Sequence, residues 1–88
     1  MALSGQITVT TAGTAVQGTT QNGRLFALKA HPDNTDVVWV GNVSGDVAST
    51  NGFPLEAGET VVLSLDNLND IYVDADVNGE KLCWIRLN

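Results

Sequence analysis

The chain has 88 residues, of which 43% are apolar and 16% charged, and its formal net charge is −6. This length suits one domain, and the apolar content is typical of a folded protein and not of a disordered one. Four cations against ten acids cannot neutralise a run of phosphates, which argues against nucleic acid and anionic membrane as partners.

Charge is distributed unevenly along the chain. The first 23 residues carry no charged side chain, whereas residues 33–88 hold all ten acids. A segment without charge is typical of a buried contact surface. We therefore predict a single domain over residues 1–88 in which residues 1–22 dock against a partner or a neighbouring subunit, with Leu3, Ile7 and Val9 as contact candidates.

Short stretches of alternating apolar and polar residues recur along the chain, separated by Gly, Asn, Asp and Pro. Alternation with a period of two predicts strands, and no stretch has the helical period. The predicted strands, in chain order, are residues 6–11, 14–17, 23–30, 36–42, 46–49, 59–66, 70–77 and 80–87. Seven or eight such strands predict an all-β fold, a small antiparallel β-sandwich that is jelly-roll-like or immunoglobulin-like.

Three turns have a chemical signature. His31-Pro32-Asp33-Asn34 predicts a type I turn because Pro presets φ, and Gly58 supplies a residue that tolerates positive φ. Asn78-Gly79 predicts a β-hairpin between residues 70–77 and 80–87.

The register of this hairpin can be predicted from its apolar residues. A three-residue loop with a glycine bulge gives one clean apolar face, whereas a two-residue loop mixes the two faces. The bulged register predicts four pairs: Val73 with Cys83, Ile71 with Ile85, Tyr72 with Trp84, and Asp70 with Arg86. Cys83 is then a buried thiol, and Tyr72 and Trp84 lie on the outer face.

The sequence offers little catalytic or metal-binding chemistry. Asp74, Asp76 and Asn78 match the first half of a calcium loop, but its twelfth position, which requires a bidentate Glu, is Ile85. We therefore expect no metal and no cofactor, with these three residues as the candidates if a cation binds. One histidine without a strong nucleophile partner predicts that the chain is not an enzyme.

Aromatic residues are the main binding candidates. Trp84 and Tyr72 are expected on the surface, and Phe26 in the core. Trp39 has two open interpretations, because Val38 and Val40 also claim the core and only one parity points inward. Phe53-Pro54-Leu55 is an apolar tripeptide in a polar loop, and it either caps the sandwich or contacts a partner.

Several motifs resemble those of small structural proteins of tailed bacteriophages. They are Trp39-Val40-Gly41, residues 51–59 (NGFPLEAGE), residues 70–79 (DIYVDADVNG) and the opening residues 7–16 (ITVTTAGTAV). The resemblance spans most of the chain. It implies a β-sandwich virion component, in first place a decoration or cement protein that binds the major capsid protein on the outside of the shell, often as a homotrimer.

Other functions stay open at this point. Similar proteins occur in head fibres, at the neck or on the tail, and exposed aromatic residues would also suit a carbohydrate- or receptor-binding module. The N-terminal residues lack the features of a secretion signal, and no apolar run has membrane-spanning length. We therefore expect synthesis in the bacterial cytoplasm and a final location on the virion.

Overall fold

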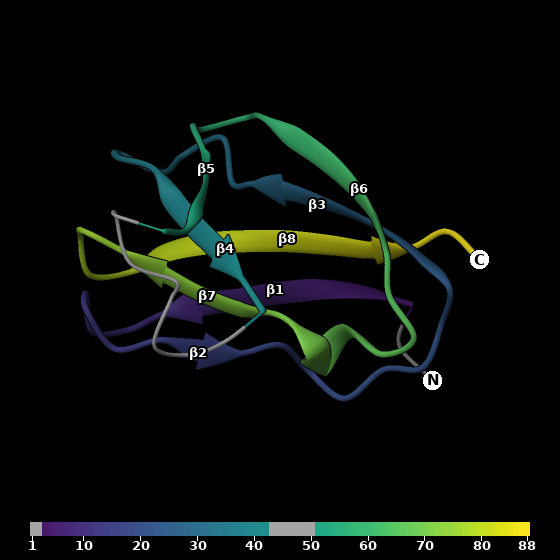
Figure 1. The fold of residues 1–88 in the computed structure, drawn as a ribbon. Helices are drawn as coiled ribbons and strands as arrows, with labels where there is room; N and C mark the ends of the chain where they lie inside the picture. Colours follow the sequence, from purple (N-terminus) through teal and green to yellow (C-terminus); the bar gives the residue numbers. More distant parts are fainter. Residues whose placement is uncertain (1–2, 43–50) are drawn as a thin grey trace.

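The computed structural model describes residues 3–42 and 51–88, and this part of the chain forms eight strands in two antiparallel sheets (Figure 1). One sheet has the order β1-β8-β3-β6 and the other the order β2-β7-β4-β5. The all-β class and the sandwich architecture are therefore confirmed. The strands are β1 Ser4–Val9, β2 Val16–Gln17, β3 Leu25–Ala30, β4 Val38–Gly41, β5 Phe53–Leu55, β6 Thr60–Ser64, β7 Tyr72–Ala75 and β8 Glu80–Arg86.

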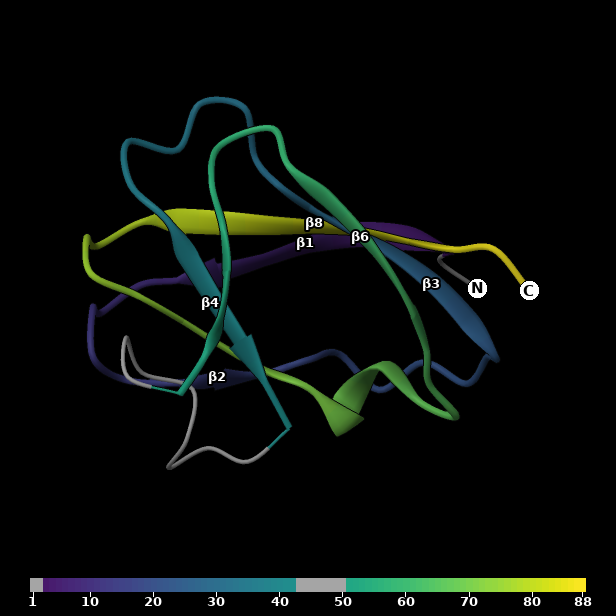
Figure 2. The same cartoon turned by 45° about the horizontal axis from the view of Figure 1, so that its top comes forward.

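The strand order is that of a jelly roll. β1 pairs with β8, β2 with β7, β3 with β6 and β4 with β5, so the first four strands run back along the last four. Ladders between β3 and β8 and between β4 and β7 join these pairs into two sheets. Every connection except that between β4 and β5 crosses from one sheet to the other (Figure 2). An immunoglobulin domain would instead place its first two strands in one sheet.

The core is built from alternate residues of each strand. Phe26 and Leu28 of β3 are fully buried, and Val38 and Val40 of β4 point inward from the other sheet. Burying each such side chain stabilises the fold by about 1.5–3 kcal/mol. The prediction that Phe26 fills the core is confirmed.

The predicted hairpin between the last two strands is wrong. β7 and β8 belong to different sheets, and the residues between them carry the chain across the end of the sandwich. Gly79 has the positive φ expected of it, +86°, but it turns the chain between sheets. β8 pairs with β1 and β3 instead. The four pairs expected from a hairpin therefore do not form: Val73 with Cys83, Ile71 with Ile85, Tyr72 with Trp84, and Asp70 with Arg86.

This arrangement reverses the buried face of β8. A hairpin with the predicted register would bury the odd-numbered residues of β8, but Leu82 and Trp84 point inward and Ile85 is exposed. Trp84 pairs with Gly5 of β1, where a Cβ would lie only 3.1 Å from the indole Nε1, and makes an edge contact with Phe26. Because β7 and β8 lie in opposite sheets, the residues of β8 that point inward need not be those that a hairpin with β7 would bury. Trp84 points into the core, so the expectation that it lies on the surface is wrong.

The N-terminal residues are built into the sandwich. β1 pairs with β8 along its whole length, and Ile7 and Val9 are buried in the core. β2 pairs with β7 at the edge of the other sheet. Docking by residues 1–22 stays a prediction, and within residues 3–22 it would use the side chains that are exposed on the sandwich.

Two segments differ from or fall outside the predicted elements. Phe53–Leu55, expected in a loop, forms the edge strand β5, where Pro54 costs no ladder hydrogen bond. The strand predicted at residues 46–49 lies outside the described residues. A single 3-10 turn, η2 (Leu68–Asp70), precedes β7. The turn at residues 31–34 is confirmed by a bond from Asn34 N–H to His31 O at 3.0 Å.

Candidate binding surfaces

The outer face of the β1-β8-β3-β6 sheet carries the clearest surface feature of the described residues. Because side chains alternate across a sheet, the buried positions of each strand identify its outward positions. The outward residues are Ser4, Gln6 and Thr8 on β1, Lys81, Cys83 and Ile85 on β8, Leu25, Ala27 and Lys29 on β3, and Thr60, Val62 and Ser64 on β6.

Apolar side chains form a continuous row on this face. Ala27 pairs with Ile85 on one side and with Val62 on the other, and these two neighbours are 47% and 51% exposed. Leu87 is 50% exposed and lies beside Leu25, whose carbonyl accepts the Leu87 N–H at 2.7 Å. We call these five residues the apolar row. Contiguous exposed apolar side chains mark interaction sites more often than scattered ones do.

The charge of this face differs from that of the whole chain. Among its outward positions, all of which the structure describes, the charged residues are Lys29 and Lys81 and none is acidic, although the chain has a net charge of −6. Opposite charges around an apolar centre favour a specific partner and disfavour others. The face is therefore suited to a surface with an apolar centre and acidic residues around it.

A hollow of about 300 Å³ opens on the same face between residues of β3, β6 and β8. Cys83 lines it and is half-buried, with Gln6 Nε2 donating to its Sγ at 3.9 Å. The prediction that Cys83 is buried in the core is wrong, because the inward residues of β8 are the even-numbered ones. A hollow next to an apolar row can accept a side chain from a partner, which is the usual geometry of an interface anchor.

The contact candidates from the sequence fall into three groups. Four have at most 5% exposure and belong to the core: Ile7, Val9, Leu55 and Trp84. Three are exposed: Leu3, Phe53 and Pro54. Two are half-buried on the outer face of the second sheet: Trp39 and Tyr72. Leu55 caps the core, whereas Phe53 is 55% exposed, and a partner contact through Phe53 stays a prediction.

The apolar row was missed by the sequence analysis. The predicted hairpin placed Ile85 on the inward face. Leu25 and Ala27 were assigned to a strand, but no prediction was made of the side of the sheet to which their side chains point. A usable signal existed in β3, where full burial of Phe26 requires its neighbours Leu25 and Ala27 to point outward.

Two of the three candidate cation ligands, Asp74 and Asn78, have structural partners. Asp74 is 6% exposed, and its Oδ1 accepts from the N–H groups of Gly13 and of the next residue at 3.0 and 2.7 Å. Asn78 Oδ1 accepts from Ala12 N–H at 2.7 Å. These bonds tie the β1–β2 connection to β7 and to the loop after it, so Asp74 is a buried acid with a structural role. Within residues 3–42 and 51–88, no group of three or more His, Cys, Asp and Glu residues could hold a metal ion.

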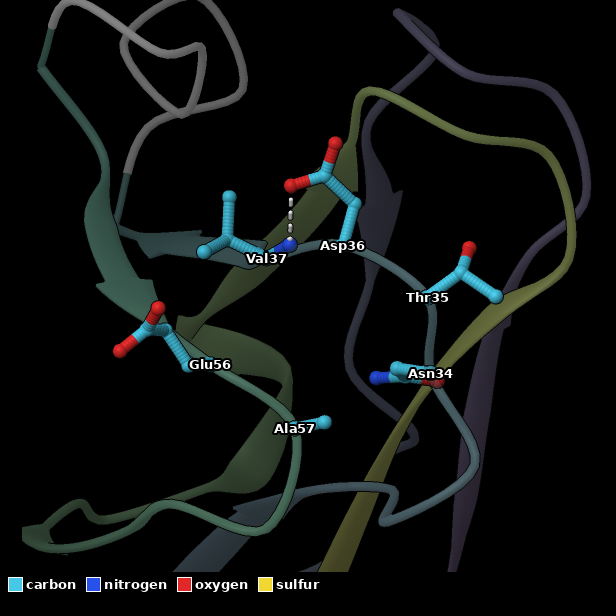
Figure 3. Close-up of a pocket in the computed structure, with 6 residues that line it drawn as sticks. All are labelled: Asn34, Thr35, Asp36, Val37, Glu56 and Ala57. Atoms are coloured by element: carbon cyan, nitrogen blue, oxygen red, sulfur yellow. Dashed lines mark hydrogen bonds between the residues drawn. The ribbon is translucent and has the colours of Figure 1, made fainter.

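A hollow of about 420 Å³ lies between the β3–β4 and β5–β6 connections (Figure 3). It is lined by Asn34, Thr35, Asp36, Val37, Glu56 and Ala57. Asp36 Oδ1 accepts the Val37 N–H at 2.8 Å, and the carboxylates of Asp36 and Glu56 do not converge on one point (Figure 3). The geometry is that of a water-exposed space between two loops.

The Glu80 carboxylate accepts hydrogen bonds from the β3–β4 connection that lines this hollow. The sequence analysis did not identify this role of Glu80. Its side chain is 4% exposed. Oε2 accepts the Asp36 N–H at 2.7 Å, and Oε1 accepts from the N–H and hydroxyl of Thr35 at 3.2 and 3.4 Å. Asn34 adds two bonds to the backbone of Lys81, at 2.8 and 2.9 Å. Both side chains hold the β3–β4 connection against β8.

The single histidine lies apart from both hollows. His31 Nδ1 accepts the Asp33 N–H at 3.0 Å and lies 3.9 Å from Asp33 Oδ2. His31 lines neither the 420 Å³ nor the 300 Å³ hollow. That the chain is not an enzyme stays a prediction.

Comparisons with known proteins give no relative. No protein-family model, no curated protein and no solved structure matches the chain significantly. None of the described residues belongs to a helix with the length and hydropathy needed to cross a bilayer.

Proposed function

We propose that this chain is a structural protein of a bacteriophage virion that binds the outer surface of the capsid through the outer face of its β1-β8-β3-β6 sheet. One observation carries the binding mode: on a chain with a net charge of −6, the outward strand positions of this face hold two lysines and no acid beside the apolar row. The class of partner, the major capsid protein or another virion protein, comes from the resemblance of residues 51–59 and 70–79 to phage structural proteins.

The energetics of such a contact are favourable. Val62, Ile85 and Leu87 are each about half exposed, so a partner can remove the remaining apolar surface of each from water. Lys29 and Lys81 would steer an acidic rim on the partner toward this face. Jelly rolls occur in viral capsid domains and also in lectins, so the fold by itself does not choose between them.

The alternative of a carbohydrate-binding module loses one of the three aromatic residues on which a sugar could stack. Trp84 lies in the core and offers no ring face to a sugar. Trp39 and Tyr72 remain half-buried on the other sheet. A head-fibre, neck or tail location would use the same docking chemistry, and a homotrimer would need a contact separate from the apolar row.

Co-sedimentation with capsid shells tests the proposal. Shells assembled from the major capsid protein of the phage that produces this chain, and free of the chain, are mixed with the purified wild type and with Ile85→Asp. The wild type should sediment with the shells, and Ile85→Asp should bind at least tenfold more weakly. Val77→Asp is the matched control, because Val77 is also an exposed apolar residue but lies in the β7–β8 turn.

Thiol labelling gives a second measurement on the same samples. Cys83 should react with a maleimide in the free chain and be protected on shells. A wild type that does not bind shells, or an Ile85→Asp variant that binds as well as Val77→Asp, would overturn the proposal. Selective binding to a glycan array without binding to shells would replace it with the carbohydrate alternative.

A further inference from the structure

The outer strand β6 leaves one backbone edge without a neighbouring strand. β6 is last in the order β1-β8-β3-β6 and pairs with β3 alone among the described strands. Ala30 N–H donates to Glu59 O at 3.0 Å and Leu65 N–H to Arg24 O at 3.1 Å, which fixes the phase of the ladder. Since bonded and non-bonded pairs alternate in an antiparallel ladder, the N–H and C=O groups of Val62 and its even-numbered neighbours point to the free edge.

Within its own residues, β6 lacks the features that protect most edge strands. Thr60–Ser64 contains no charged residue, no proline and no glycine. Natural edge strands are usually blocked by lysine, proline, a bulge or a covering loop. An edge of this kind is a template on which another strand can pair.

An apolar groove runs along the same edge, on the inner side. It has a volume of about 330 Å³ and is lined by Val40, Phe53, Val61, Leu63, Leu65 and Ile71, with Gly41 and Asn42. Val61, Leu63 and Leu65 are only half-buried although they pack against the core. The facing edge strand β5 has only three residues.

The charges at the ends of β6 indicate which segment would fit. Glu59 and Asp66 flank the strand and are exposed. The chain's own β3 shows the complementary pattern, because Arg24 and Lys29 flank an apolar stretch. In the β3–β6 ladder Lys29 is opposite Thr60, next to Glu59, and Arg24 is bonded to Leu65, next to Asp66.

We propose that the free edge of β6 binds an extended segment of a partner protein, with apolar side chains in the groove and a cation at each end. The segment would add a fifth strand to the sheet, and its alternate side chains would enter the groove beside Leu63 and Phe53. Main-chain hydrogen bonds would supply affinity, and the groove and flanking acids would supply selectivity. This site goes beyond the docking face, since it uses the edge and inner side of β6.

A peptide with the sequence of residues 23–30 (GRLFALKA), fluorescently labelled and added to the full chain, is the probe. Fluorescence anisotropy should show saturable binding. The same peptide with Arg24→Glu and Lys29→Glu should bind at least tenfold more weakly. No saturable binding, or equal binding of the acidic peptide, would refute the proposal.

A proline variant tests the edge directly. Val62→Pro removes an N–H that points away from β3, so the fold should tolerate it, but the variant should lose peptide binding at least tenfold. Thr8→Pro is the matched control on the opposite edge, since Arg86 N–H donates to Leu3 O at 2.8 Å and places the Thr8 N–H outward in the same way.

Hydrogen exchange on the wild type removes any dependence on how the variant folds. At saturating peptide, the Val62 amide should exchange at least tenfold more slowly, and the Val61 amide should change little because it already points to β3. An unchanged Val62 amide would refute strand addition even if the peptide bound elsewhere.

Discussion

Replacing Glu80 with alanine removes the acceptors that hold the β3–β4 connection. The bond from the Asp36 N–H is short, 2.7 Å, and a hydrogen bond to a charged group contributes about 1.5–3 kcal/mol. The two Thr35 bonds are longer, 3.2 and 3.4 Å, and water can reach this exposed loop and replace part of them. We therefore expect Glu80→Ala to lower the free energy of unfolding by about 2 kcal/mol.

Urea unfolding followed by tryptophan fluorescence measures this change. For a domain of this size a loss of 2 kcal/mol lowers Tm by about 8–16 °C. Glu80→Gln keeps one carbonyl oxygen for the Asp36 N–H, so it should lose about 1 kcal/mol. Glu56→Ala is the control, because Glu56 is an exposed acid that lines the same hollow and should change stability by less than about 0.5 kcal/mol. A Glu80→Ala variant as stable as Glu56→Ala would refute this account of the loop.

Three further predictions follow from burial and close contacts. Leu55→Ala should cost about 2–5 kcal/mol and Phe53→Ala less than about 1 kcal/mol, and equal losses in thermal melting would contradict the division of this segment into a cap and an exposed side chain. Gly18→Ala should prevent native folding as judged by circular dichroism, because a Cβ there would collide with the Leu68 carbonyl oxygen, and a native spectrum would contradict it. Cys83 is half-buried on the outer face, so its thiol should react with a maleimide in the native chain. A thiol that reacts only after the chain is unfolded would contradict this position.

Local patterns in the sequence were sufficient to predict most strands and part of the core. The alternation of Val61, Leu63 and Leu65 with Val62, Ser64 and Asp66 predicted β6 as a half-buried strand. The first three side chains do pack against the core. Phe26 was placed correctly for the same reason. Such predictions succeed because one face of a strand contacts the core and the other contacts water, so consecutive residues along the strand differ in polarity.

The pairing of strands could not be obtained in the same way. Asn78-Gly79 is a strong hairpin signal, yet it connects strands in opposite sheets, since β8 gains more by pairing with β1 and β3 and burying Trp84. The partners of β8 are more than 50 residues away in sequence, and no local pattern specifies them. The contacts of Glu80 with residues 35 and 36 depend on the same long-range pairing, so they too were beyond the sequence.

Val62 links the two proposed binding surfaces. Its side chain belongs to the apolar row on the outer face, while its N–H points to the free edge of β6. A standard protein interface buries about 800 Å² on each partner, which is about one sixth of the 4832 Å² surface of this chain. Five apolar side chains and two lysines on one small sheet cover only part of such an area. A partner that covered the face and also supplied a strand to β6 would bury one continuous surface, and the backbone bonds along the edge would fix its register where the apolar row alone permits sliding.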